Sequence, residues 1–81
     1  MAKKDKLLEK ARNNPNGLRF NEFETLLKSY NWVFDHQKGS HQIWYSPQKT
    51  RLPIQPKGAK AKGYQVQQFL NIYDEEENDE S

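Results

Sequence analysis

Large apolar side chains recur at separations of three and four residues in three stretches of the chain, which is the period of an amphipathic helix. The clearest stretch covers residues 20–30, and Asn21, with a glutamate three positions later, is the predicted N-cap of this helix. A weaker stripe predicts a helix over residues 3–12, because the proline and the Asn-Gly pair of residues 13–17 would end it. The last stretch predicts a helix over residues 64–74.

In the middle of the chain apolar and polar positions alternate with a period of two, which is typical of strands. This alternation predicts a hairpin from residues 32–38 to residues 40–45, with a Lys-Gly pair at its turn. A third short strand is expected over residues 50–55, at the edge of the sheet because Pro53 has no backbone N–H to donate. Residues 56–63 are expected to form a basic loop.

The order of two helices, three strands and a helix predicts an α+β domain. Three antiparallel strands with helices on one face form a two-layer sandwich whose other sheet face stays open. A chain of 81 residues holds one compact domain with a thin core. The large apolar side chains expected to build that core are Leu18, Phe20, Phe23, Leu26, Leu27, Tyr30, Trp32, Phe34, Ile43, Trp44, Tyr45, Leu52, Ile54, Val66, Phe69, Leu70 and Ile72.

Charge divides the chain into three parts, although the net charge is only +2. Residues 1–17 are interpreted as an N-terminal helix and turn, residues 18–73 as the domain, and residues 74–81 as an acidic tail that is too poor in apolar side chains to fold alone. No acidic residue lies between His36 and Tyr73, whereas six lysines and arginines do. Such a surface attracts polyanions. It is either a nucleic-acid-binding surface or a solvated lysine-rich surface without a partner.

Several classes of protein are disfavoured by what the sequence lacks. Without cysteine the chain can form no disulfide, no thiolate zinc site and no thiol nucleophile. No apolar run has the length of a signal peptide or a membrane span, so a cytoplasmic location is expected. Neither histidine forms a recognised metal-binding spacing with the acidic residues, and we expect no metal and no cofactor.

Four segments between Leu18 and Ile72 carry a resemblance through their order and spacing. They are Arg19-Phe20-Asn21-Glu22-Phe23 with Leu26-Leu27-Lys28, then Tyr30-Asn31-Trp32, then Gly39-Ser40-His41 with Ile43-Trp44-Tyr45-Ser46-Pro47, and then Leu52-Pro53-Ile54. Together they resemble the HicA family of toxin ribonucleases. The resemblance implies the topology of a double-stranded-RNA-binding domain, cleavage of mRNA, a type II toxin–antitoxin system and a HicB-type antitoxin as protein partner.

The chain departs from that family at two places. Many members have a second histidine shortly after the third strand, where this chain has Gln55-Pro56-Lys57. The predicted helix over residues 3–12 is an addition to the minimal domain.

His41 is the candidate catalytic residue, because an imidazole can both accept and donate a proton near neutral pH. Cleavage of RNA requires both transfers, one from the 2′-hydroxyl and one to the leaving 5′-oxygen. Gly39 would allow the backbone to approach a phosphate, and basic side chains would neutralise the charge on the phosphorane. The residues expected to bind RNA are Lys38, Gly39, Ser40, Lys49, Arg51, Lys57, Lys60 and Lys62.

Strand parity constrains the residues around His41. Of Trp44 and Tyr45, at most one can face the core fully, and the other can stack on a base. His41 shares the parity of Ile43, so it must lie near the end of its strand if Ile43 is buried. His36 is interpreted as a surface strand residue. Two other functions remain open, a noncatalytic RNA-binding module and a protein-interaction domain that accepts a partner strand at its sheet edge.

Overall fold

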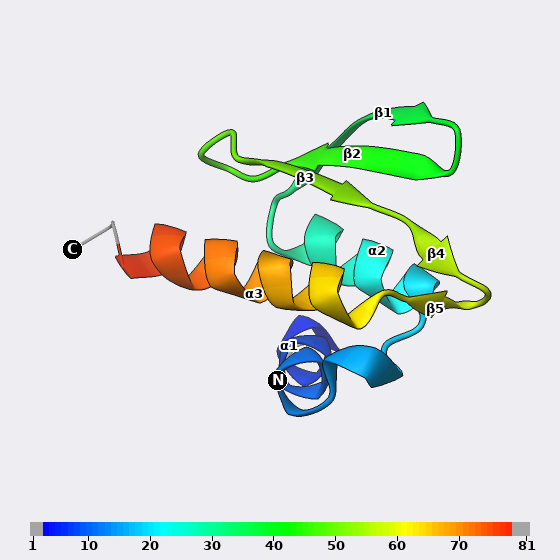
Figure 1. Cartoon of the computed structure of the whole chain (residues 1–81). Coiled ribbons are helices and arrows are strands. Elements are labelled where there is room, and N and C mark those ends of the chain that lie inside the picture. The colour runs from blue at the N-terminus through cyan, green and yellow to red at the C-terminus, as the bar shows by residue number, and fades with distance from the viewer. Residues whose placement is uncertain (1–2, 79–81) are drawn as a thin grey trace.

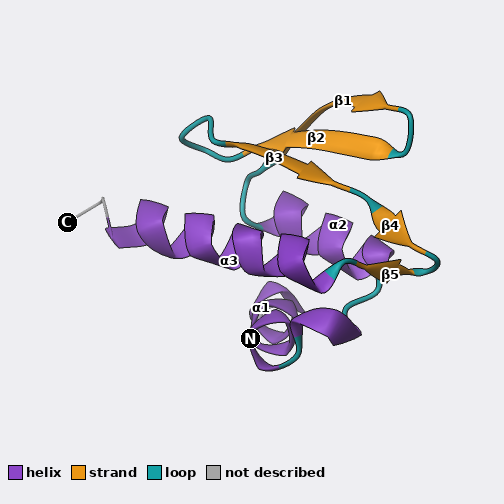
Figure 2. Cartoon of the chain, in the orientation of Figure 1, coloured by secondary structure: helices purple, strands orange, loops and turns teal. Residues whose placement is uncertain are grey.

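The computed structural model describes residues 3–78, with side chains from Lys6 onward (Figures 1 and 2). Every predicted helix and strand of the sequence is present in the expected order. The elements are α1 (Lys3–Asn13), the short 3-10 helix η1 (Pro15–Gly17), α2 (Phe20–Ser29), β1 (Val33–Lys38), β2 (His41–Tyr45), β3 (Arg51–Ile54), β4 (Pro56–Lys57), β5 (Lys60–Ala61) and α3 (Gly63–Asn78).

The main sheet is antiparallel with the strand order β1-β2-β3, and α2 and α3 cover one of its faces (Figure 1). This arrangement confirms the α+β sandwich with an open sheet face. Helix α1 lies on the side of α2 and α3 that is away from the sheet, and it contacts both helices. Because Ala11 is completely buried in the same core as the sheet, α1 is packed on the domain.

Strand pairing shows which side chains face the helices. Trp44 pairs with Leu52 on β3 and with Phe34 on β1, and both Trp44 and Leu52 belong to the buried core. Gln42, two positions before Trp44, donates a hydrogen bond from Nε2 to Glu24 Oε2 of α2 at 3.0 Å. Since alternate residues of a strand point to opposite faces, His41 and the other odd-numbered residues of β2 face away from the helices.

The core contains most of the predicted apolar residues. Phe69 lies at its centre, with ring centroids 6.0 Å from Phe23 and 5.3 Å from Trp32. The prediction for Phe34 was wrong, because its side chain is 44% exposed at the sheet edge and packs edge-to-face on Trp44. The buried core consists of Ala11, Leu18, Phe23, Leu26, Leu27, Trp32, Trp44, Leu52, Ile54, Ala61, Val66, Phe69 and Leu70.

The N-cap of α2 differs from the prediction by two residues, because it is Arg19 and not Asn21. The helix begins at Phe20, and the preceding Arg19 has extended backbone angles. The Arg19 backbone N–H donates to Glu22 Oε1 at 2.9 Å, so Glu22 supplies the capping carboxylate in place of Glu24. Asn21 lies inside the helix, where its carbonyl accepts a bond from the Thr25 hydroxyl.

The acidic end of the chain is helical over residues 74–78, where the sequence predicted disorder. Arg12 of α1 binds Asp74 through two hydrogen bonds of 2.7 and 3.1 Å. Glu76 accepts hydrogen bonds from the hydroxyls of Ser46 and Thr50, which lie in the β2–β3 turn. The prediction of disorder failed for residues 74–78 because their partners are distant in sequence. The other residues of the predicted tail, 79–81, lie outside the described part of the chain.

The expected loop over residues 56–63 contains a second, two-stranded sheet formed by β4 and β5. Gly58 makes its turn with a φ of 63°, a conformation that glycine adopts without strain. The hairpin is held to the start of α2 by bonds from the Phe20 N–H to the Ala59 carbonyl and from the Ala61 N–H to the Leu18 carbonyl, both 3.0 Å long. The lysines of this segment are therefore carried on an ordered hairpin.

Candidate nucleic-acid interface

The sheet face that points away from the helices carries side chains from all three strands, with polar and basic residues among apolar ones. The pairing places Val33, Tyr45 and Arg51 in one cross-strand row and His36, Ile43 and Pro53 in the next. Lys38 and His41 pair in a third row beside the β1–β2 turn. Trp44 is the core residue of the Trp44–Tyr45 pair, so Tyr45 is the ring on the open face.

His41 is the first residue of β2, and its side chain is exposed. Ile43 is only 3% exposed, so the expected position of His41 near a strand end is confirmed. Gly39 makes the adjacent turn with a φ of 62°, and a Cβ at this glycine would meet nothing within 4 Å. The turn therefore leaves the surroundings of the imidazole open to solvent and to a large ligand.

A chain of side-chain hydrogen bonds connects this turn to the lysine-bearing hairpin. Gln55 donates from Nε2 to Ser40 Oγ at 3.1 Å, and its Oε1 accepts a bond of 2.9 Å from Lys62 Nζ. The Gln55 backbone N–H donates in turn to the Oε1 of Gln65, a buried residue of α3. Gln55 thus orients Ser40, the neighbour of His41.

Three of the predicted RNA-binding lysines line one hollow of about 800 Å³ between the β4–β5 hairpin and the start of α3. Its described lining contains no acidic residue, and the Tyr64 ring at its wall is 62% exposed. The hollow is lined by Asn16, Lys57, Lys60, Ala61, Lys62, Gly63 and Tyr64. Asn16 and Tyr64 were not predicted as site residues, because their approach to the lysines depends on the fold of the hairpin.

The predicted site residues divide between the two ends of the sheet. Lys38, Gly39 and Ser40 surround His41 at the end from which the β4–β5 hairpin continues (Figure 1). Lys49 lies in the β2–β3 turn at the opposite end, and Arg51 pairs with Tyr45 near that turn. Four residue steps along β2 span about 13 Å, so Lys49 and Arg51 are not brought next to His41.

Comparison with known proteins adds the deciding observation. Residues 20–72, more than half of the chain, match the family model described as the HicA toxin of bacterial toxin–antitoxin systems. The chain belongs to the HicA toxin family. It is therefore, in general terms, an RNA-cleaving toxin with an antitoxin partner. No curated protein and no solved structure gives a significant match.

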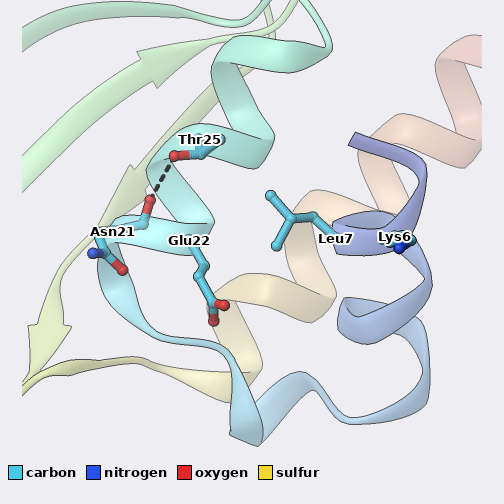
Figure 3. Close-up of a pocket in the computed structure, with 5 residues that line it drawn as sticks. All are labelled: Lys6, Leu7, Asn21, Glu22 and Thr25. Atoms are coloured by element: carbon cyan, nitrogen blue, oxygen red, sulfur yellow. Dashed lines mark hydrogen bonds between the residues drawn. The ribbon is translucent and has the colours of Figure 1, made fainter. Parts of the chain in front are cut away.

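The matched segment of this HicA toxin covers α2, the strands and most of α3, and it leaves α1 outside. A groove between α1 and α2 is lined by Lys6, Leu7, Asn21, Glu22 and Thr25 (Figure 3). Here the backbone N–H of Arg19, together with an ion pair of 3.0 Å to Lys10, lowers the pKa of Glu22. These interactions join two helices behind the sheet, so the groove is not part of the interface around His41.

No group of three metal-binding side chains occurs within residues 3–78. In the same range, no helix has both the length and the apolar character needed to cross a membrane.

Proposed function

We propose that this HicA toxin is a metal-independent endoribonuclease that cleaves mRNA with His41 as its catalytic residue. One observation carries the proposal: the exposed His41 imidazole stands on the open sheet face beside a turn that hydrogen bonds join to the lysine-lined hollow. An imidazole that can exchange protons is thus combined with cations that can hold a phosphate backbone.

In the proposed reaction, the ribose 2′-oxygen attacks the adjacent phosphorus while the P–O5′ bond breaks. The products are a 2′,3′-cyclic phosphate and a free 5′-hydroxyl, so neither water nor a metal ion enters this step. His41 exchanges a proton with the 2′-hydroxyl or the leaving oxygen. We assign the neutralisation of the charge that develops on the phosphorane to Lys38, because this residue pairs with His41 across the strands.

The lysines around the hollow are proposed to bind phosphates that flank the cleaved bond. Lys57, Lys60 and Lys62 would act as fixed charges, and the exposed Tyr64 ring offers a surface on which a base can stack. Lys49 and Arg51 would contact the RNA separately, at the other end of the sheet. An RNA that follows the open face would reach both groups.

A HicB-type antitoxin is proposed to cover His41 and the neighbouring lysines, because an uninhibited ribonuclease would degrade the RNA of its own host cell. Every residue of β1 is exposed and this strand forms an edge of the sheet, so a partner also has access to unpaired backbone groups there. We place both proteins in the cytoplasm, where mRNA is translated. Copurification of the toxin with the product of the neighbouring gene tests this proposal, and a chain that stays unbound and inert in its native host contradicts it.

An RNA-cleavage gel with purified protein, with and without EDTA, tests the proposed activity. The wild type should cleave RNA equally well under both conditions, and His41→Ala should bind RNA without cleaving it. A noncatalytic RNA-binding module would bind without turnover in every variant, and a protein-interaction domain would show no salt-dependent RNA affinity. Loss of wild-type cleavage in EDTA would contradict the metal-free mechanism.

A further inference from the structure

The open sheet face carries a second imidazole that the proposed mechanism does not use. His36 on β1 pairs with Ile43 on β2, and His41 is two positions before Ile43 on the same face. Diagonal neighbours of this kind are separated by roughly 7–8 Å in antiparallel sheets. The two histidines of the chain, which are separated by a turn in the sequence, are therefore brought to one patch of the surface.

Irregular strand pairing accompanies this placement. The register shifts between Phe34 and His36, so Asp35 is the extra residue of a β-bulge. Without the shift His36 would be opposite Gln42, whose side chain faces the helices, and the imidazole would point toward the core side of the sheet. Bulges of this kind re-aim side chains in edge strands. The extra residue thus brings His36 to the face of His41.

Asp35 also orients the imidazole. Its Oδ2 lies 2.6 Å from Nδ1 of His36, and the two side chains are each 53% exposed. A carboxylate in this position accepts the Nδ1–H and leaves Nε2 outside this contact. The same carboxylate compensates the charge of the ring when both nitrogens carry protons.

We propose that His36, held by Asp35, is the general acid of the cleavage reaction and that His41 is the general base. This inference rests on the proposed ribonuclease function and assigns the two proton transfers within it. His41 Nε2 or Nδ1 accepts the proton of the 2′-hydroxyl, the 2′-oxygen bonds to phosphorus, and the P–O5′ bond breaks. His36 Nε2–H gives its proton to the departing 5′-oxygen, so the reaction needs no other donor. Asp35 is a positioning residue.

The general spacing of diagonal strand positions, roughly 7–8 Å, fits this division of roles. A base and an acid that each lie about 2.6–3.2 Å from an oxygen, on opposite sides of one phosphorus, must themselves be several ångströms apart. The charged and titratable groups around His36 are Asp35 and Lys38 on its own strand. Across the strand pair they are His41 and Tyr45, and Arg51 is farther away on β3. The helices lie behind the other face of the sheet.

The test compares two RNA substrates in single-turnover cleavage. One has the normal 5′-oxygen at the cleaved bond, and the other has sulfur there, because a thiolate departs without needing a proton. His36→Gln should slow cleavage of the normal substrate on the order of 100-fold or more and should cleave the sulfur substrate at nearly the wild-type rate. His41→Gln should cleave neither substrate.

The Asp35 variants test the positioning role. Asp35→Ala should lose less of the cleavage rate than His36→Gln, and the sulfur substrate should restore that rate too. Asp35→Asn should retain part of the activity because its amide oxygen can accept the Nδ1–H.

The pH profile supplies a second measurement. The wild type should show a bell-shaped profile, and His36→Gln should lose the alkaline limb. Circular dichroism serves as the control for folding, which an exposed edge-strand residue should not disturb. If His36→Gln cleaves both substrates like the wild type while His41→Gln is inactive, the role of His36 is refuted and the ribonuclease proposal stands. If His41→Gln is also fully active, the ribonuclease mechanism itself is refuted.

Discussion

Replacing Glu76 tests whether the acidic end of the chain belongs to the fold. Glu76 Oε2 accepts hydrogen bonds from the Ser46 hydroxyl and, at 3.0 Å, from the Thr50 hydroxyl. Ser46 is only 4% exposed, and its oxygen also accepts the Thr50 backbone N–H at 2.9 Å. Glu76→Ala therefore leaves a buried hydroxyl without its acceptor, which costs about 1–3 kcal/mol of the free energy of unfolding.

For a domain of this size, each kcal/mol lowers the thermal midpoint by roughly 4–8 °C. Thermal and urea unfolding followed by circular dichroism would measure the loss. Glu75→Ala is the matched control, because it removes an equal charge from an exposed position one residue away and should change stability by less than about 0.5 kcal/mol. Equal stabilities of Glu76→Ala and Glu75→Ala would refute the role given to this contact. When Ser46 is already replaced by alanine, Glu76→Ala should lower the free energy of unfolding much less than it does in the wild type.

The remaining predictions concern acid stability, RNA affinity and chelation. The hydrogen bonds from Arg12 lower the pKa of Asp74, so this pair stabilises the fold above the unfolded value near 3.8 and stops doing so as the pH falls through the lower folded value. Asp74→Asn should accordingly flatten the acid limb of a stability–pH curve by no more than about 1 kcal/mol, and an unchanged limb contradicts the pairing. Lys57→Gln or Lys60→Gln should reduce the slope of log affinity against log salt by about 0.7–0.9, whereas Lys6→Gln, on the far side of the helices, should not. EDTA should leave the cleavage rate unchanged, as measured on the same RNA.

Local sequence patterns predicted most of the fold because its elements follow from short-range periodicity. The stripe that includes Phe23 and Leu26 and the edge position of Pro53 are both found in the structure. The errors arise where long-range contacts decide the outcome. Glu76 is held in a helix by a turn some 30 residues earlier, and β5 is held by the backbone at Leu18. No local propensity contains that information.

The candidate site was predicted only in part, because some of its contacts join residues that are distant in sequence. The motif Gly39-Ser40-His41 and the density of lysines drew attention to this surface, and the expected place of His41 near a strand end agrees with its position as the first, exposed residue of β2. Sequence distance could not show that Lys49 lies at the opposite end of the sheet, nor that Gln55 bonds to Ser40. The register shift that places His36 on the face of His41 has no signature in the residues themselves.

Parallel measurements of RNA cleavage and RNA affinity for His41→Ala test the central claim most directly. The account predicts a loss of about 10²–10⁴-fold in the single-turnover rate with unchanged affinity, because the imidazole transfers protons and does not hold the phosphate backbone. Lys57→Gln provides the contrasting control, with weaker binding and a nearly unchanged rate at saturating protein. Cleavage by purified His41→Ala at the wild-type rate would contradict the account.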